Sequence, residues 1–457
     1  PPSSGPINRV PVRTVPQAPS SATATTLTAS LGPVPTVVPA SSTTPSTTPG
    51  TTSSVTPTAT STTIGPAITP VIPRLALASV QLGIGLLGGE VRVQLTVSAS
   101  ALPTNQFRTN AFSSLVVSVP LPPGVTLAGA DNPAWSCTAQ GACTIASLAS
   151  GASSTAVLRL SIAATVALPI TFAPTVTNPP NAVVQSTPLA ITAGTMAGLQ
   201  VQEFARGAVA AIGNTVVSCI TVLCLPVDVD ADKATFNSST ADLGVTGTVA
   251  KALLVWSGDS PASDRGTVKL LTPGGTVNVV ADAIRTDYSP EYKDEFVAYK
   301  DVTTLVTAGG TYGVANLRTS LLSYGGWSLI VLTHDSTQPE RSLTIAIPLS
   351  YVTNQTPTSL ALAASSSTTA AAHVVVSAFE GDEKLLGDTL KLNGIDLGSV
   401  GDAFHGAIAG ASRNPQIDRN YRVDLFDAVG VGGPSLDIAS ADDPVMIAAV
   451  GIALDLS

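Results

Sequence analysis

Charged residues are scarce in this sequence. Lys, Arg, Asp and Glu make up 11% of its 457 residues, against roughly 25% in ordinary soluble domains. Ser, Thr, Asn and Gly must therefore cover much of the surface. The net charge is −9 and no cluster of Lys or Arg occurs. The chain therefore lacks a basic surface that could bind the phosphates of a nucleic acid, and we expect no nucleic-acid partner. Weak surface charge also leaves little repulsion between copies, which favours ordered self-association, with aggregation as the alternative.

Aromatic residues and methionine are also rare: aromatic residues make up 4% of the chain, and it contains two methionines. The apolar content of 44% is therefore mostly Val, Ala, Leu and Ile, which suits pleated sheets. With 38 Gly and 35 Pro as turn residues, this composition predicts an all-β fold of many short strands. The most apolar stretch near an end, residues 445–454, is half as long as the roughly 20 residues that span a bilayer. We expect a final core strand there and no membrane span.

The four cysteines form two close pairs, Cys137 with Cys143 and Cys219 with Cys224. Neither pair has the Cys-x-x-Cys spacing of a zinc or redox motif, and neither has a histidine nearby. Two local disulfides in an oxidising, extracellular compartment are the better interpretation. The chain begins with Pro-Pro, not Met, and shows no signal peptide, so we expect a processed product.

Composition divides the chain into three parts. Residues 1–74 are rich in Ser, Thr and Pro, with Arg9, Arg13 and Arg74 as their only charges, and predict an extended arm or stalk. The segments TATTLTASL and VPTVVPA within it could add as a strand to an open sheet edge. Residues 75–195 alternate apolar and polar side chains between Pro and Gly, which predicts a β-sandwich of immunoglobulin-like size. A larger β-rich unit, 199–457, follows.

Two resemblances support this division. The run VPLPPGVTLAG followed by WSCTAQGACTIASLASGASSTAVLRLSI resembles the Ig-like surface repeat of secreted bacterial and archaeal proteins. The segments YGGWSLIVLTHDS and VVSAFEGDEKLLGD are similar to a domain of large secreted surface proteins that has no assigned enzymatic activity. SLTIAIPLSYVTNQ departs from that domain's usual pattern. The resemblances imply an extracellular location and β-sandwich architecture. We expect an Ig-like β-sandwich followed by a larger, jelly-roll-like β-sandwich, either undivided or with a sub-boundary near 353–370.

Two groups of acidic residues are candidate calcium sites, because Ca²⁺ takes several carboxylate oxygens from short segments. Asp228, Asp230 and Asp232 have the alternate spacing of a calcium loop, but alternate residues of a strand also share one solvent-facing side. The second group is drawn from the Glu-Gly-Asp turn and the segments that follow it. Its members are Glu380, Asp382 and Asp388, joined by Glu383 and, if the segments are adjacent, by Asp418, Asp424 and Asp427. Solvated loop acids are the alternative at both places.

The remaining motifs give no catalytic site. GIGLLG, with Gly83, Gly85 and Gly88, matches a dinucleotide fingerprint in spacing, but no βαβ pattern surrounds it, so we expect a turn. The three histidines are far apart and belong to no HExxH or nucleophile-elbow motif, so no enzyme is predicted. The three tryptophans, Trp135, Trp256 and Trp327, lie in apolar strand patterns and are expected in the core. Asn237 and Asn354 lie in N-glycosylation sequons.

These observations predict a secreted structural protein of a prokaryotic cell surface. It would assemble with copies of itself into a filament, sheath or surface layer, through docking of the arm or addition of a strand to a sheet edge. Cell-envelope or glycan partners are also considered. No cofactor is required, and structural calcium is considered as an addition. The alternative is a stalked adhesin or glycan-binding protein.

Overall fold

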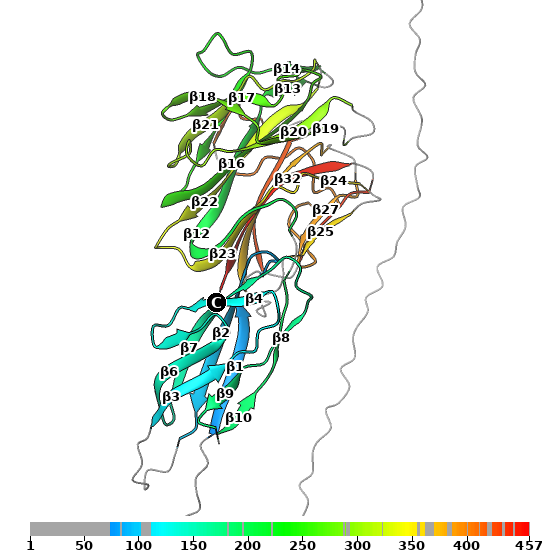
Figure 1. Ribbon diagram of the computed structural model, residues 1–457. Coiled ribbons are helices and arrows are strands. Elements are labelled where there is room, and N and C mark those ends of the chain that lie inside the picture. The colour runs from blue at the N-terminus through cyan, green and yellow to red at the C-terminus, as the bar shows by residue number, and fades with distance from the viewer. Residues whose placement is uncertain are drawn as a thin grey trace, which may run out of the picture. The chain divides into compact units, whose positions relative to one another are not determined.

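The structure is a computed structural model of the chain, and the described residues form only strands, turns and loops (Figure 1). The all-β prediction is therefore confirmed. Within this part of the chain, no helix is present that could cross a membrane. The predicted arm, apart from Arg74, lies outside the described residues. The structure describes residues 74–82, 85–101, 111–180, 182–193, 196–220, 223–286, 288, 293–321, 323–353, 357–361, 370–381, 386–399, 401–410, 412–417, 423–431, 435–441 and 444–456.

The first folded part is a β-sandwich, here called the N-terminal sandwich. One sheet has the order β10-β1-β2-β7-β4 and the other β5-β6-β3-β9, and both contribute to a single apolar core. Two short strands, β8 and β11, pair separately. The bounds are β1 Arg74–Leu82, β2 Glu90–Ala99, β3 Ala111–Ser118, β4 Val125–Ala130, β5 Trp135–Cys137, β6 Ala142–Ala149, β7 Ser153–Ile162, β8 Ile170–Phe172, β9 Thr175–Asn178, β10 Val183–Ser186 and β11 Leu189–Ile191.

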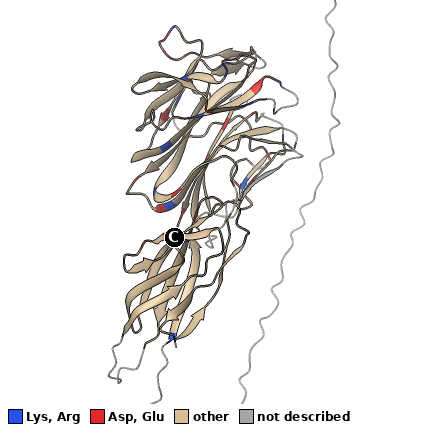
Figure 2. Ribbon diagram, in the orientation of Figure 1, with Lys and Arg blue, Asp and Glu red and all other residues tan. Residues whose placement is uncertain are grey.

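Alternation explains this sandwich. In β2, every second residue from Val91 to Val97 is buried, and the residues between them face outward, as expected for strands with one wet face. The outer face is lined by hydroxyls, with Thr96 bonded to Thr155 across to β7. Gly88, at φ 80°, lies in a turn between β1 and β2, as expected for the end of the glycine-rich segment. Figure 2 shows few charged residues on this sandwich.

The second folded part contains three main sheets and a hairpin. Its strands are β12 Leu199–Thr215, β13 Val217–Ile220, β14 Leu223–Pro226, β15 Ser238–Leu243, β16 Thr248–Asp259, β17 Thr267–Thr272, β18 Gly275–Val280, β19 Ala283–Thr286, β20 Glu295–Asp301, β21 Gly310–Ala315, β22 Gly325–His334, β23 Glu340–Ala346, β24 Ser350–Val352, β25 Thr358–Ala361, β26 Ala371–Phe379, β27 Thr389–Leu392, β28 Ile395–Asp396, β29 Arg413–Asn414, β30 Val423–Val431, β31 Ser435–Ala439 and β32 Val445–Asp455.

One eight-strand order occurs twice in this part. The first set pairs as β12-β22-β16-β20 and β15-β21-β17-β18, and the second as β23-β32-β26-β30 and β25-β31-β27-β28. Numbered along the chain, both sets have strands 1-8-3-6 in one sheet and 2-7-4-5 in the other. This is the connectivity of a jelly roll, so we call them the first and second jelly rolls. The second begins at Glu340, ahead of the sub-boundary predicted near 353–370.

The long strand β12 joins the two jelly rolls into one sheet. Its residues 199–206 pair with β23, and its residues 207–215 pair with β22. Gly207 lies where the pairing changes, and a Cβ there would be 2.0 Å from the carbonyl oxygen of Thr333. Only glycine permits this close approach of the two backbones.

Strands of the joined sheet are buried on both faces. In β16, Leu253 and Val255 belong to the core between the two jelly rolls, whereas Leu254 and Trp256 belong to the core inside the first. Strands buried on both faces have continuous apolar sequences, which explains the runs ALLVW and SLIVL. The final strand β32 is likewise buried along residues 445–454, so the predicted core strand is confirmed. All three tryptophans are buried, as predicted.

Candidate assembly edges and polar clusters

Both predicted disulfides are present. Cys137 lies directly opposite Cys143 across β5 and β6, with 4.0 Å between their Cα atoms. Cys219 lies opposite Cys224 across the β13–β14 hairpin, at 3.9 Å. Paired cysteines are typical of proteins in oxidising compartments.

The loop of Asp228, Asp230 and Asp232 is organised by hydrogen bonds. Ser238 Oγ donates to Asp228 Oδ1 at 2.7 Å, and Thr235 Oγ1 donates to Asp230 Oδ1 at 2.9 Å. Asp232 makes an ion pair with Lys269 at 3.0 Å. Across the described residues, no three acidic, histidine or cysteine side chains are arranged to hold a metal. Calcium at this loop stays a prediction, which calorimetric titration with Ca²⁺ would test.

The second acidic group is brought together only in part. A Cβ built on Gly381 would lie 2.4 Å from Asp424 Oδ2, so Asp424 lies against the Glu-Gly-Asp turn. Asp388 is fully buried, in a parallel bridge with Asp402. Asp427 is directed instead toward His373, 2.5 Å from its Nε2. Asp382, Glu383 and Asp418 lie outside the described residues.

The two sequons have different outcomes. Asn237 is 0% exposed, its Nδ2 donates to the carbonyl of Leu317 at 2.7 Å, and its Oδ1 accepts from the N–H of Leu317 at 3.0 Å. A glycan on Nδ2 would break this pairing and has no space in the fold. Burial of Asn237 therefore argues against glycosylation of this residue in the folded chain, and its modification stays to be tested. Asn354 lies outside the described residues.

A buried polar cluster joins the two jelly rolls. The hydroxyl of Tyr324, which precedes β22, lies 3.1 Å from Ser257 Oγ of β16 and donates to Glu380 Oε1, after β26, at 3.2 Å. Burial, together with the charges of nearby acidic groups, raises the pKa of Tyr324 well above its usual value. Tyr324 therefore remains a hydrogen-bond donor at any physiological pH. A second link joins Ser328 of β22 to Ser377 of β26, at 2.6 Å between their hydroxyls.

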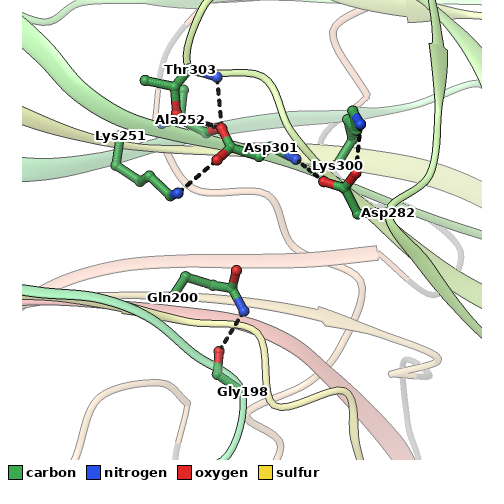
Figure 3. A network of polar contacts seen from close by, with 8 residues as sticks. All are labelled: Gly198, Gln200, Lys251, Ala252, Asp282, Lys300, Asp301 and Thr303. Carbon is green, nitrogen blue, oxygen red and sulfur yellow. Dashed lines mark hydrogen bonds and ion pairs between the residues drawn. The ribbon is translucent and has the colours of Figure 1, made fainter.

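A partly exposed charge network joins β16 to β20 (Figure 3). Asp301 accepts from Lys251 Nζ and from Thr303 Oγ1, each at 2.6 Å. Asp282 pairs with Lys300 at 2.5 Å and accepts from the N–H of Asp301. Partial burial opposes ionisation of both carboxyls, but these donors outweigh it and hold the pKa of each below its usual value. The network holds the ends of β16 and β20 together, and no sequence motif predicted it.

Three edge strands expose valines. Val183 of β10 is 45% exposed, Val280 of β18 is 62% exposed, and Val429 of β30 is 76% exposed. None of these strands contains a lysine. Lysine is the side chain that most often prevents an edge strand from pairing with another chain. Edges that lack it can pair with a further strand.

Two hollows lie beside β30. A cleft of about 440 Å³ between the jelly rolls is lined by Gln338, Arg341, His373, Asp427 and Asp455, among others. A smaller one, of about 250 Å³, lies between β28 and β30 and is mostly apolar. The other two histidines have partners elsewhere. His334 is hydrogen-bonded to the carboxylate of Glu203, and His405 to the backbone carbonyl of Asp402.

Comparison with protein-family models gives no match, and none of the curated proteins matches the chain. The proposals below therefore rest on the residues and the geometry.

Proposed function

We propose that this chain is an extracellular structural protein that assembles with copies of itself into a polymer of the cell surface. The observation that carries the proposal is the set of exposed valines on β10, β18 and β30, edge strands that no lysine guards. β10 and β18 carry no charged residue, and β30 carries Asp424 and Asp427 but no lysine. An exposed sheet edge without lysine is a template for pairing with another chain. In a protein that stays monomeric, such edges would be a liability.

The rest of the described structure supports the same function. The outer face of the N-terminal sandwich is lined by hydroxyls, and pairs such as Ser98 with Ser153 bond to each other across strands. Figure 2 shows few charged residues along the strands of this sandwich, so copies can approach it at little electrostatic cost. The two disulfides suit a protein that remains outside the cell.

Sedimentation velocity of the purified full-length chain over a concentration series tests the proposal. We expect large species that grow with concentration. A variant with Val183→Lys, Val280→Lys and Val429→Lys should sediment as a monomer, because charge at each edge opposes pairing. A wild-type chain that remains monomeric at every concentration would contradict the proposal.

A second function, glycan binding by a surface adhesin, is favoured by the cleft between the jelly rolls. Its lining combines an amide, a guanidinium, carboxylates and an imidazole, from Gln338, Arg341, Asp427, Asp455 and His373, and polar groups of these kinds can bond sugar hydroxyls. Binding to a glycan array by a chain that sediments as a monomer would favour this function over the polymer.

A further inference from the structure

The two jelly rolls differ at one equivalent edge. In the first, β20 is the sixth strand, and its outer edge is covered by β19 in antiparallel pairing from Ala283 opposite Tyr299 to Thr286 opposite Phe296. In the second, the sixth strand is β30, and its sheet ends there among the described residues. In the first jelly roll, β19 of the same chain thus occupies the position beside the sixth strand. In the second, no described strand occupies the equivalent position beside β30.

Among the described residues, only the beginning of β30 has a neighbour on its outer edge. The N–H of Leu425 donates to the carbonyl of Ala407, and the N–H of Ala409 donates to the carbonyl of Leu425. Beyond Leu425, no described residue pairs with the outer edge of the strand. Backbone groups alternate in direction along a strand, so Asp427 and Val429 direct their N–H and C=O outward, as Leu425 does.

This uncovered stretch lies beside a mostly apolar hollow. The hollow of about 250 Å³ is lined from one side by Leu392, Ile395, Asp396 and Leu397, and from the other by Ala428, Val429 and Gly430 of β30. Asp396 is the one charged residue of this lining. In the first jelly roll, the chain that follows β18 crosses the matching region. There the N–H of Ala281 donates to the carbonyl of Gly266, and Ala281 packs against the core.

The arm contains a segment with the properties of the missing strand. Residues 20–32 (SSATATTLTASLG) form its longest stretch without proline, and proline cannot donate a backbone hydrogen bond to a sheet. Leu27 and Leu31 fall on one side of an extended strand at this spacing. The arm carries Arg9 and Arg13 and no acidic residue, whereas the whole chain is net negative, so the arm and a neighbouring body attract each other.

We propose that residues 20–32 of a second copy add as a strand to the edge of β30 over Asp427–Val431, with a leucine of the arm in the hollow. This inference rests on the proposed function and specifies how the polymer is joined. Among the three valine edges, β30 is favoured because a hollow for an apolar side chain adjoins it.

The test mixes two full-length variants. Leu27→Pro removes the donor strand, and Val429→Lys blocks the acceptor edge without disturbing the pairing with β26, because Val429 directs its backbone groups outward. Each variant alone should sediment as a monomer. A 1:1 mixture should form dimers and nothing larger, since one intact arm meets one intact edge. Val280→Lys, at an exposed valine of β18, is the matched control and should polymerise as the wild type does.

Two results would overturn the inference while leaving the proposed function standing. One is polymerisation of Val429→Lys at the wild-type rate, and the other is loss of polymer in Val280→Lys to the same extent. If the wild type itself never polymerises, the proposed function fails, and a synthetic peptide of residues 20–32 still tests the edge. Peptide binding at least tenfold weaker to Val429→Lys than to the wild type supports the acceptor edge, and equal binding refutes it.

Discussion

The hydroxyl of Tyr324 lies between Ser257 Oγ, at 3.1 Å, and Glu380 Oε1, at 3.2 Å. Ser257 and Glu380 occupy equivalent places in the two jelly rolls, since each comes at the end of a third strand and immediately precedes Gly-Asp in the sequence. One phenol thus joins the two repeats at matching positions. The core between the repeats is otherwise mostly apolar.

Tyr324→Phe removes this bridge and should lower the free energy of unfolding by about 1–3 kcal/mol, the usual cost of depriving buried polar groups of a donor. Urea denaturation measures the change. Tyr299→Phe, at a half-buried tyrosine of β20, is the control and should cost less. Equal losses in the two variants would show that Tyr324 has no special role in joining the repeats.

The disulfide Cys137–Cys143 should stabilise the N-terminal sandwich. Closing a short loop restricts the unfolded chain and is worth about 2 kcal/mol. Replacing both cysteines by alanine should therefore lower the melting temperature of the N-terminal sandwich in scanning calorimetry. An unchanged transition would mean that the β5–β6 pairing alone holds this hairpin in place.

Acid should weaken the ion pairs that Asp282 and Asp301 make with Lys300 and Lys251. The pKa values of Asp282 and Asp301 lie below the usual value in the folded chain, so their contribution is fully present above the unfolded value of about 3.9 and is lost as pH falls through the lower folded value. Both groups are partly exposed, so the expected loss is below about 1 kcal/mol for each pair. Urea denaturation from pH 6 to pH 3 should show less acid sensitivity in Asp301→Asn than in the wild type.

Asn237 should be unmodified in the mature protein, because its side chain is buried and bonded to the backbone of Leu317. Peptide mass spectrometry checks this directly. Asn237→Ala should lower the free energy of unfolding by about 1–3 kcal/mol, since it leaves backbone groups of Leu317 without these partners. A glycan found on Asn237 would show that the loop folds differently in the cell.

Local patterns predicted the parts of the fold that depend on local physics. The alternation of β2 predicts one buried and one exposed face, and cysteines five or six residues apart can pair across a hairpin. The repeat of the jelly roll was not predicted, because strands such as β16 and β32 are buried on both faces and lose the alternation that would mark them. Their similarity lies in strand order, which becomes visible only once pairing is known.

The candidate sites were less predictable than the fold. Tyr324 and Glu380 are 56 positions apart, and nothing in either neighbourhood signals their contact. The acceptor edge could not be predicted because an edge is defined by which strand is absent beside it. The sequence did indicate that the arm contains strand-forming segments, which the proposed pairing uses.

Electron microscopy of the purified full-length chain, alongside material from the surface of the producing cells, tests the central claim most directly. The account predicts regular filaments or lattices built from this one chain, with the same repeat distance in both samples. Dispersed single particles in both samples would contradict it and would favour the adhesin.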